Sequence, residues 1–359
     1  MKGATLDHER VVARRGERSG ATVIVGVHST RLGPALGGVR IWSYSDDVEG
    51  LHDALRLSAG MTLKAAAAGL ELGGGKGVIC MPEGGFADPG ARRDALLDFG
   101  DLVESLGGDY VTAEDVGATP EDLVAIAERT SHVTGLPAEH GGSGDPSPLT
   151  ALGVERAIEA CLEDRFGVAD PAGRRIAIIG LGHVGGALAG LLAERGAELA
   201  VTDIAQGARS RARAIGAEWL DPETAAEVEC DVLAPCALGG IVSADSVERL
   251  GCAAICGSAN NQLADDSLAA ELQRREVLYA PDFLVNAGGL INVAREVHGY
   301  DAAEALAMVE AIGESTRKVL LRAREEAIAP LVAARELAGA RLGQATPAAR
   351  EHSLPRLVA

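Results

Sequence analysis

The segment "IAIIGLGHVGGALAGLLAERGAELAVTDI", residues 176–204, constrains the fold of this chain more than any other part. Three glycines, Gly180, Gly182 and Gly185, follow an apolar run in G-x-G-x-x-G spacing and open a run with helical periodicity. A second apolar run follows that helix and leads to Asp203. This order of strand, glycine turn, helix and strand is typical of a dinucleotide-binding βαβ unit.

The residue types at this turn indicate which ligand it binds. The first glycine permits the tight turn, the second lets backbone approach a pyrophosphate, and the third lets helix and strand pack closely. Asp203 lies where a carboxylate binds the adenosine ribose and repels a 2′-phosphate, and no arginine follows it directly, which favours NAD over NADP. The alternative is a tight βα turn without a ligand. The predicted NAD-binding residues here are Gly180, Gly182, His183, Val184, Gly185 and Asp203.

The rest of the chain fits two domains, as expected for 359 residues. After Thr150, apolar strands alternate with helices, which predicts a parallel, doubly wound Rossmann sheet. The first region is mixed α/β, with strands expected at 21–30, 76–81 and 109–113 and a helix opening at Thr119. A loop rich in Gly, Pro and Ser places the boundary near Gly144. The predicted α/β fold therefore has a substrate domain at 1–144, an NAD domain at 145–325 and a helical segment at 326–359 that can return to the first domain.

Charge and cysteine usage exclude several classes of protein. A net charge of −19 repels nucleic acid and anionic lipid, and no long uninterrupted apolar stretch predicts a membrane span. The six cysteines include no C-x-x-C pair, and the amino terminus has no apolar signal region, so free thiols and a cytoplasmic location are expected. The histidines show no metal-ligand spacing, and we predict no metal.

Two lysines are the most informative candidates for catalysis. Only four of the 33 basic residues are lysines, and two of these, Lys64 and Lys76, lie in the small, apolar stretch "MTLKAAAAGLELGGGKGVIC". A lysine on a solvated helix face is the ordinary alternative for Lys64. Unlike a guanidinium, however, an ammonium can lose its proton when it is desolvated or lies near another cation. Two lysines in one pocket would provide an anchor for an anionic substrate and a base.

Several motifs resemble one enzyme family, in its order along the chain from about His28 to His298. They are "RLGPALGGVRIW", "GMTLKAAAAGLELGGGKGVI", "YVTAEDVGATPEDL", "GLGHVGG", "APCALGG", "GSANNQL" and "YAPDFLVNAGGLINVAREVHG". Together they are similar to the Glu/Leu/Phe/Val amino acid dehydrogenase family, and most similar to its leucine, valine and phenylalanine branch. The resemblance implies reversible NAD-dependent oxidative deamination of an L-amino acid to a 2-oxo acid and ammonia, in a cleft between two domains.

The resemblance also implies roles for individual residues. Lys64 matches the lysine that binds the substrate α-carboxylate, and Lys76 the catalytic lysine that assists the attack of water on the imino acid. Asp115 matches the carboxylate that handles protons on the substrate nitrogen, with Glu114 as its rival, since alternation along a strand directs only one of the two into the site.

Further positions follow from the same resemblance. Asn286 matches an asparagine that supports the carboxylate, and Asn260 or Asn261 one that holds the nicotinamide amide; without the resemblance, these would be turn or cap residues. The remaining predicted substrate contacts are the backbone at Gly37 and Gly38 and a pocket of Leu36, Ala113, Leu290 and Val293. Because these pocket residues are aliphatic, leucine or valine is favoured, phenylalanine stays open, and glutamate is disfavoured.

Two other functions compete with this interpretation. A 2-hydroxy acid dehydrogenase would share the nucleotide fold but needs an Arg and His pair, and the lysine pair argues against it. A catalytically silent NAD-binding protein would not need Lys64, Lys76 and Asp115 together. Related enzymes assemble as homo-oligomers, so we expect more than one subunit, with the amino acid, 2-oxo acid and ammonia as small-molecule partners.

Overall fold

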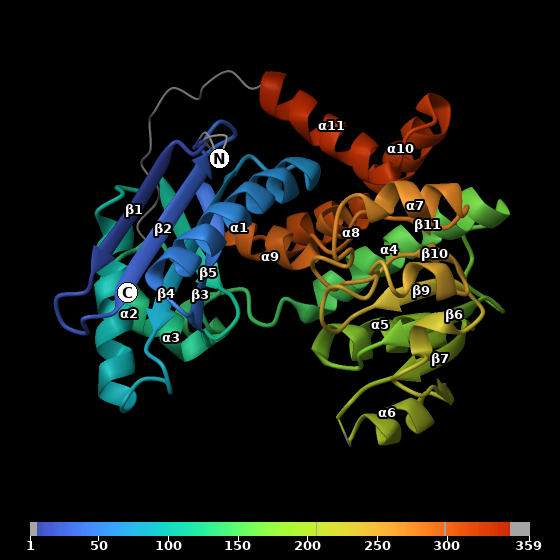
Figure 1. The fold of residues 1–359 in the computed structure, drawn as a ribbon, viewed down its shortest axis with the longest axis horizontal. Coiled ribbons are helices and arrows are strands. Elements are labelled where there is room, and N and C mark those ends of the chain that lie inside the picture. The colour runs from blue at the N-terminus through green and yellow to red at the C-terminus, as the bar shows by residue number, and fades with distance from the viewer. Residues whose placement is uncertain (1–5, 206, 298, 345–359) are drawn as a thin grey trace. The chain divides into compact units, whose positions relative to one another are not determined.

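The computed structural model describes residues 6–205, 207–297 and 299–344 (Figure 1). The chain forms two compact units. Unit 1 extends to Gly144 and adds Asn292–Asp301 and the chain from Ala338 onward, whereas unit 2 comprises Asp145–Ile291 and Ala302–Leu337. His298 and the residues after Gln344, which end two ranges used in the sequence analysis, lie outside the described residues.

Unit 1 is built on a five-stranded sheet with the order β1-β2-β4-β3-β5. β2 pairs antiparallel with both β1 and β4, whereas β3 lies parallel to β4 and β5. The predicted strands at β2, β4 and β5 are present, and the sequence analysis missed β1 and β3. The strands are β1 (Arg10–Arg15), β2 (Thr22–Ser29), β3 (Ala35–Ser43), β4 (Gly73–Met81) and β5 (Tyr110–Glu114).

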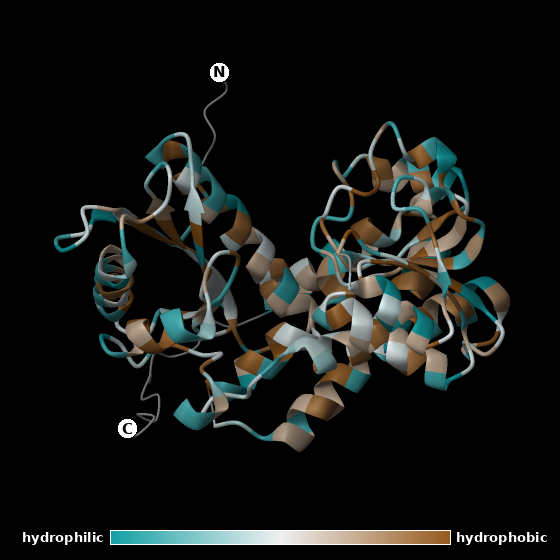
Figure 2. Cartoon of the chain, turned by 90° about the horizontal axis from the view of Figure 1, so that it is seen from below, coloured by the Kyte–Doolittle hydropathy of each residue, from teal (hydrophilic) through white to brown (hydrophobic). Residues whose placement is uncertain are grey.

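Helices cover the two faces of this sheet. Helix α1 (Asp47–Ala67) packs Ala54 against Val78 and Cys80 of β4. On the other face, α2 (Pro89–Glu104) and α3 (Pro120–Ala127) bury a larger apolar cluster that includes Phe99 of α2. A short 3₁₀ turn (Ala138–His140) follows. In Figure 2 brown, apolar residues gather on the strands, and teal residues mark loops and outer helix faces.

Local sequence signals explain where these helices begin. The side chain of Asp46 accepts hydrogen bonds from the backbone N–H groups of Val48 and Glu49 at the start of α1. Thr119 and Asp122 form a reciprocal capping box at the start of α3, with proline in the first turn. The predicted start of α3 is therefore confirmed, because side-chain oxygens satisfy N–H groups that lack helical partners.

Unit 2 has a six-stranded sheet with the order β11-β10-β9-β6-β7-β8, and every pairing in it is parallel. The chain builds outward from β6 in one direction and then restarts on the other side at β9. This is the doubly wound order predicted from the sequence, with its topological switch point between β6 and β9. The strands are β6 (Arg175–Ile179), β7 (Glu198–Thr202), β8 (Glu218–Trp219), β9 (Cys230–Pro235), β10 (Cys252–Ile255) and β11 (Leu278–Tyr279).

Helix α4 packs against both α5 and α10, and α4 and α5 also contact the strands. The helices of unit 2 are α4 (Ser147–Phe166), α5 (His183–Glu194), α6 (Ala208–Ala214), α7 (Leu268–Arg274), α8 (Asp282–Val285) and α10 (Ala302–Glu326), with 3₁₀ turns at Ala225–Glu227 and Val247–Arg249. The cysteines are unpaired, as predicted. No helix in the described ranges is long and apolar enough to cross a membrane.

Two helices contain a boundary between the units. The boundary at Ile291 lies inside α9 (Gly288–Glu296), and the boundary at Leu337 lies inside α11 (Pro330–Gln344). From the sequence we expect residues 145–325 to form one domain, whereas the structure groups Asn292–Asp301 with unit 1. The reason is local packing, because the second half of α9 makes its polar contacts with the loop before Gly144.

Candidate functional site

The register of the unit 1 sheet brings the predicted catalytic residues together. β3 aligns with β4 and β5 so that Gly38 lies between Lys76 and Ala113. Asp115 comes two residues after Ala113, and side chains two residues apart along an extended chain point to the same side. Lys76, Ala113 and Asp115 therefore share the face of the sheet that α1 covers.

Lys76 and Asp115 form a close ion pair on this face. The Lys76 Nζ atom lies 2.9 Å from Oδ1 of Asp115, and only 5% of the lysine side chain is exposed. Burial lowers the pKa of Lys76 below its ordinary value, opposed by the negative charge of Asp115. Burial alone would raise the pKa of Asp115, but the charges of Lys76 and Arg40 hold it below its usual range. Glu114, the rival of Asp115 in the sequence analysis, is exposed.

Arg40 is a member of this cluster that the sequence analysis did not single out. Its Nε donates to Asp115 at 2.9 Å, and its Nη1 lies 2.9 Å from Asp53 of α1. Asp53 also accepts a hydrogen bond from the Tyr44 hydroxyl at 2.9 Å. The positive charge of Arg40 contributes to the low pKa of Lys76. The available signal was an arginine near the middle of an apolar strand, within the quoted segment "RLGPALGGVRIW".

Lys64 lies on the neighbouring helix. It is half-buried in the last turn of α1, the helix that covers the Lys76 face of the sheet. The same end of α1 approaches β4 closely, because a Cβ on Gly74 would lie 2.1 Å from the backbone nitrogen of Thr62. Lys64 and Lys76 thus lie on two elements that pack against each other, α1 and β4. Lys76 itself forms its ion pair with Asp115.

Gly37 and Gly38 have a packing role. A Cβ on Gly37 would lie 1.8 Å from the Gly75 carbonyl oxygen, and one on Gly38 would lie 2.2 Å from the Glu114 oxygen. Both glycines therefore let β3 lie tightly between its neighbours, next to Asp115. Of the predicted pocket residues in unit 1, Leu36 and Ala113 are buried and Val293 is half-buried. Leu290 is buried in unit 2.

The glycine turn in unit 2 has the conformation that a dinucleotide needs. Gly180 has a φ of +102°, which side-chain-bearing residues rarely adopt. A Cβ on Gly185 would lie 2.0 Å from the Gly180 carbonyl oxygen, so this glycine is required for helix packing. A Cβ on Gly182 would meet nothing within 4 Å, which leaves room for a ligand at the N-terminus of α5. His183 and Val184 are the first residues of that helix.

Asp203 follows β7 and contacts the glycine turn directly. Its carboxylate accepts hydrogen bonds from the backbone N–H of Leu181 at 2.6 Å and of Ala205 at 2.7 Å. These bonds fix the turn, and carboxylate oxygens retain capacity for ribose hydroxyls because each can accept more than one hydrogen bond. The residues around Gly180 and Asp203 therefore fit a nicotinamide dinucleotide.

The predicted asparagines lie together after β10. The Asn286 Nδ2 donates to Oδ1 of Asn260 at 2.8 Å and to the Ser258 carbonyl at 3.1 Å. Asn286 is buried, whereas Asn260 and Asn261 are exposed. Asn261 has a φ of 52°, a conformation that asparagine tolerates better than most residues. Asn286 thus holds the Asn260 side chain in place.

The two units together define a class of enzyme. A doubly wound sheet with a glycine turn indicates nucleotide binding, and a buried lysine–aspartate pair indicates proton transfer. Residues 8–132 match the family model "Glu/Leu/Phe/Val dehydrogenase, dimerisation domain", and residues 200–348 match "Glutamate/Leucine/Phenylalanine/Valine dehydrogenase". The chain belongs to the Glu/Leu/Phe/Val dehydrogenase family and is an amino acid dehydrogenase that depends on a pyridine nucleotide.

Individual relatives agree over most of the chain. It is 43% identical to leucine dehydrogenase of Thermoactinomyces intermedius, covering 94% of this chain and 91% of the relative. It is 41% identical to valine dehydrogenase of Streptomyces virginiae, covering 94% of each. The crystal structure of L-tryptophan dehydrogenase from Nostoc punctiforme is similar with a TM-score of 0.83 and 36% identity, over 95% of this chain and 97% of that one. The predicted family and two-domain α/β fold are confirmed.

Proposed function

We propose that the protein catalyses NAD-dependent, reversible oxidative deamination of a branched-chain L-amino acid, leucine or valine, to the 2-oxo acid and ammonia. The observation that supports this most strongly is the buried pair of Lys76 and Asp115, 2.9 Å apart. A buried amine beside an ionised carboxylate provides the two proton-transferring groups that this reaction needs.

The first proton transfer falls to Asp115. Arg40 and Lys76 keep this carboxylate ionised, so it can accept a proton from the substrate ammonium. Bound NAD supplies the hydride acceptor. Lys64 holds the substrate carboxylate by charge, which leaves the amino group free to face Asp115.

The second step uses Lys76 as a base toward water. Once Asp115 carries a proton, its negative charge no longer supports the ammonium form of Lys76. Lys76 then gives up a proton more readily and can take one from the water that attacks the imino carbon. Asp115 returns its proton to the amino nitrogen, the C–N bond breaks, and the departing ammonia takes the hydroxyl proton, which leaves the carbonyl of the 2-oxo acid; Lys76 releases its proton to solvent.

The proposed substrate side chain rests on the character of the predicted substrate-contacting residues and on the relatives. Leu36, Ala113, Leu290 and Val293 offer no partner for a charged side chain, and burying one unpaired would be costly. Relatives named leucine and valine dehydrogenase match 94% of the chain. An aromatic amino acid, phenylalanine above all, is the second candidate, because the similar solved structure is named a tryptophan dehydrogenase.

NAD is the proposed cofactor form, because the Asp203 carboxylate lies at the glycine turn and would repel a 2′-phosphate. We also propose a homo-oligomer. β1 ends the unit 1 sheet in the described part of the chain, and the model matching residues 8–132 is described as a dimerisation domain. A cytoplasmic location stays a prediction from composition.

A panel of L-amino acids and 2-oxo acids, assayed with NAD or NADH and with NADP or NADPH, tests this function. The highest kcat/KM is expected for leucine or valine with NAD. A clear preference for phenylalanine would favour the second candidate. The absence of NADH formation with every amino acid would contradict the proposed function and favour a silent NAD-binding protein.

A further inference from the structure

A polar network centred on the buried Asn292 and Glu296 holds the second half of α9 within unit 1. The Tyr300 hydroxyl donates to Oδ1 of Asn292 at 2.8 Å, and Nδ2 of Asn292 donates to Oγ of Ser143 at 2.7 Å. The Ser143 hydroxyl in turn donates to the carboxylate of Glu296. The backbone N–H groups of Ser143 and Gly135 also donate to Glu296, at 2.8 and 2.7 Å.

Glu296 is the centre of this network. It is 5% exposed and Asn292 is 1% exposed, so both depend on protein partners. Three donors converge on the Glu296 carboxylate, and two of them are backbone N–H groups. A glutamine in its place would have only one oxygen and could not accept all three hydrogen bonds equally well. These contacts join residues about 150 positions apart in the sequence and play no part in the proton transfers described above.

The loop held by Glu296 also continues the sheet that carries the catalytic pair. Thr112 of β5 accepts a hydrogen bond from the Thr134 N–H at 2.8 Å and donates its own N–H to His132 at 3.0 Å. Gly135 follows directly. The chain from 132 to 135 is therefore hydrogen-bonded to β5 through residues 132 and 134, and to Glu296 of α9 through Gly135.

The loop at Gly135 lies next to two residues of the predicted substrate pocket, Val293 and Ala113. Val293 lies one helical turn before Glu296, so the two side chains share a face of α9. A Cβ on Gly135 would lie 3.7 Å from Cγ1 of Val293 and 4.0 Å from the backbone nitrogen of Glu114, which follows Ala113. Gly135 thus lies next to Val293 of α9, Leu123 of α3 and the backbone of β5, and Glu296 binds its backbone.

We propose that Glu296, through Ser143 and Gly135, is a positioning residue that sets substrate side-chain selectivity by fixing Val293 relative to Ala113. This inference rests on the proposed function, which places both residues in the side-chain pocket. Glu296 touches no reacting atom. Glu296 acts by holding Val293 in position. Apolar pockets of this kind can distinguish substrates that differ by a single methylene.

The test compares a branched 2-oxo acid with its straight-chain isomer, 4-methyl-2-oxopentanoate against 2-oxohexanoate, in the wild type, Glu296→Gln and Ser143→Ala. The isomers have the same atoms, so their kcat/KM ratio reports pocket shape. We expect the ratio to change by about three- to tenfold in Glu296→Gln, and by less in Ser143→Ala, because a shifted contact should count for less than the roughly tenfold or more that a whole methylene gives. NADH affinity should stay within about twofold.

Glu9→Gln is the matched control. Glu9 is an exposed carboxylate that accepts the Thr30 N–H and the hydroxyls of Ser29 and Thr30. It has the same kinds of donors as Glu296, but they lie at the end of β2 and not on the loop at Gly135 and Ser143, so its ratio should match the wild type. An unchanged ratio in folded Glu296→Gln or in Ser143→Ala, with only a lower melting temperature or a uniform loss of rate, would overturn the inference alone. Inactivity of the wild type with every 2-oxo acid would overturn the proposed function, and the inference with it.

Discussion

At the scale of single residues, Lys76 decides whether the proposed chemistry is right. We expect Lys76→Ala to lower kcat by roughly 10²–10⁴-fold, the usual contribution of a general base. NADH binding, measured by fluorescence titration, should be nearly unchanged, because the glycine turn belongs to unit 2. Lys318→Ala removes an exposed lysine and serves as the control. A loss of NADH affinity with intact kcat would contradict the assignment of Lys76.

Arg40 supports a second prediction, on pH dependence. Its charge adds to burial in lowering the pKa of Lys76, and with Lys76 it also lowers the pKa of Asp115. In Arg40→Gln both pKa values rise, so each group loses its proton only at higher pH. The acid limb of the kcat/KM profile for L-leucine oxidation should therefore move to higher pH.

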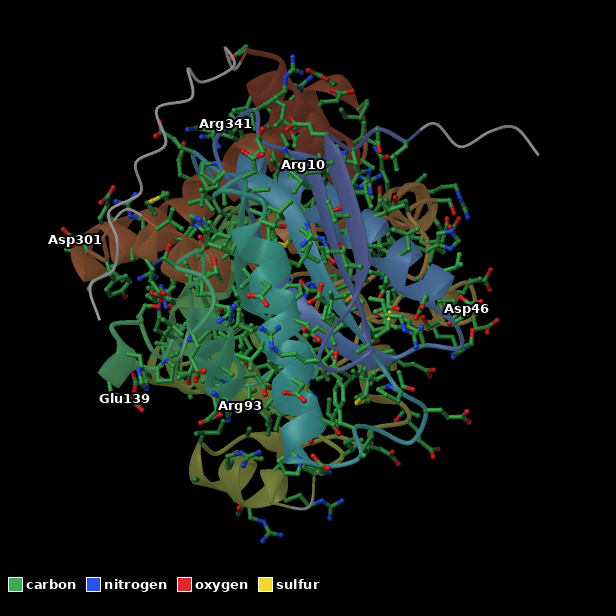
Figure 3. The ribbon with its side chains drawn as sticks, turned by 90° about the vertical axis from the view of Figure 1, so that its left-hand side faces the viewer. Arg10, Asp46, Arg93, Glu139, Asp301 and Arg341 are labelled. Atoms are coloured by element: carbon green, nitrogen blue, oxygen red, sulfur yellow. The ribbon has the colours of Figure 1, made fainter. Side chains whose placement is uncertain are left out.

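The control for this pH profile is Arg93→Gln. Arg93, labelled in Figure 3, pairs with Glu128 on the surface of unit 1, and its replacement should leave the acid limb in place. If Arg40→Gln moved the limb to lower pH or not at all, the catalytic base would not be a group that Arg40 acts on.

Residue patterns predicted part of the site and not the rest. Lysine scarcity and the glycine run pointed to Lys76, and family motifs pointed to Asp115. Arg40 and Glu296 were not predicted because their partners lie far away in sequence. Arg40 binds Asp115, and Glu296 binds the loop at Ser143. A single sequence shows such residues as ordinary charges, and only folding reveals that they are buried and paired.

At the scale of elements, α11 supports the end of α1 that carries Lys64. Arg341, labelled in Figure 3, donates to the carbonyl oxygens of Ala66 at 3.0 Å and Gly69 at 2.8 Å. Carbonyls at a helix C-terminus lack helical partners, and a cation there is favourable. Arg341→Ala should therefore lower the free energy of unfolding by about 1 kcal/mol, measured by urea denaturation.

The same substitution should raise the KM for the 2-oxo acid more than it lowers kcat, because the last turn of α1 positions Lys64. Arg335→Ala is the control on the same helix. It removes an exposed pair with Asp266, which should contribute less than about 1 kcal/mol. Equal effects of the two variants on KM would show that Arg341 has no special role.

Elements with local signals were predictable from the sequence, whereas β1 and β3 were not. The α3 start has its Thr119 cap, and β4 ends in an apolar run at residues 77–81. In contrast, β3 contains Gly37 and Gly38, and glycine inside a strand weakens the strand signal of a sequence. The structure shows that these glycines allow close strand packing, since a Cβ on Gly38 would lie 2.2 Å from a backbone oxygen of β5.

At the scale of the whole molecule, the predicted preference for NAD can be measured through protein stability, because a dinucleotide bound at the glycine turn of unit 2 stabilises the folded state. A ligand that binds only the folded state at 100 times its Kd adds about 2.7 kcal/mol to stability. NADH should therefore raise the melting temperature, whereas NADPH at equal concentration should do so much less, because Asp203 repels a 2′-phosphate.

Asp203→Asn tests the origin of this difference. The amide keeps an oxygen that can accept one of the bonds from Leu181 and Ala205, but it carries no charge. The melting-temperature shifts caused by NADH and NADPH should then become similar, mainly through a larger shift with NADPH. The ligand-free melting temperature reports any loosening of the turn separately. If NADH kept its full advantage in this variant, Asp203 would only fix the turn, and the preference for NAD would have to originate elsewhere in unit 2.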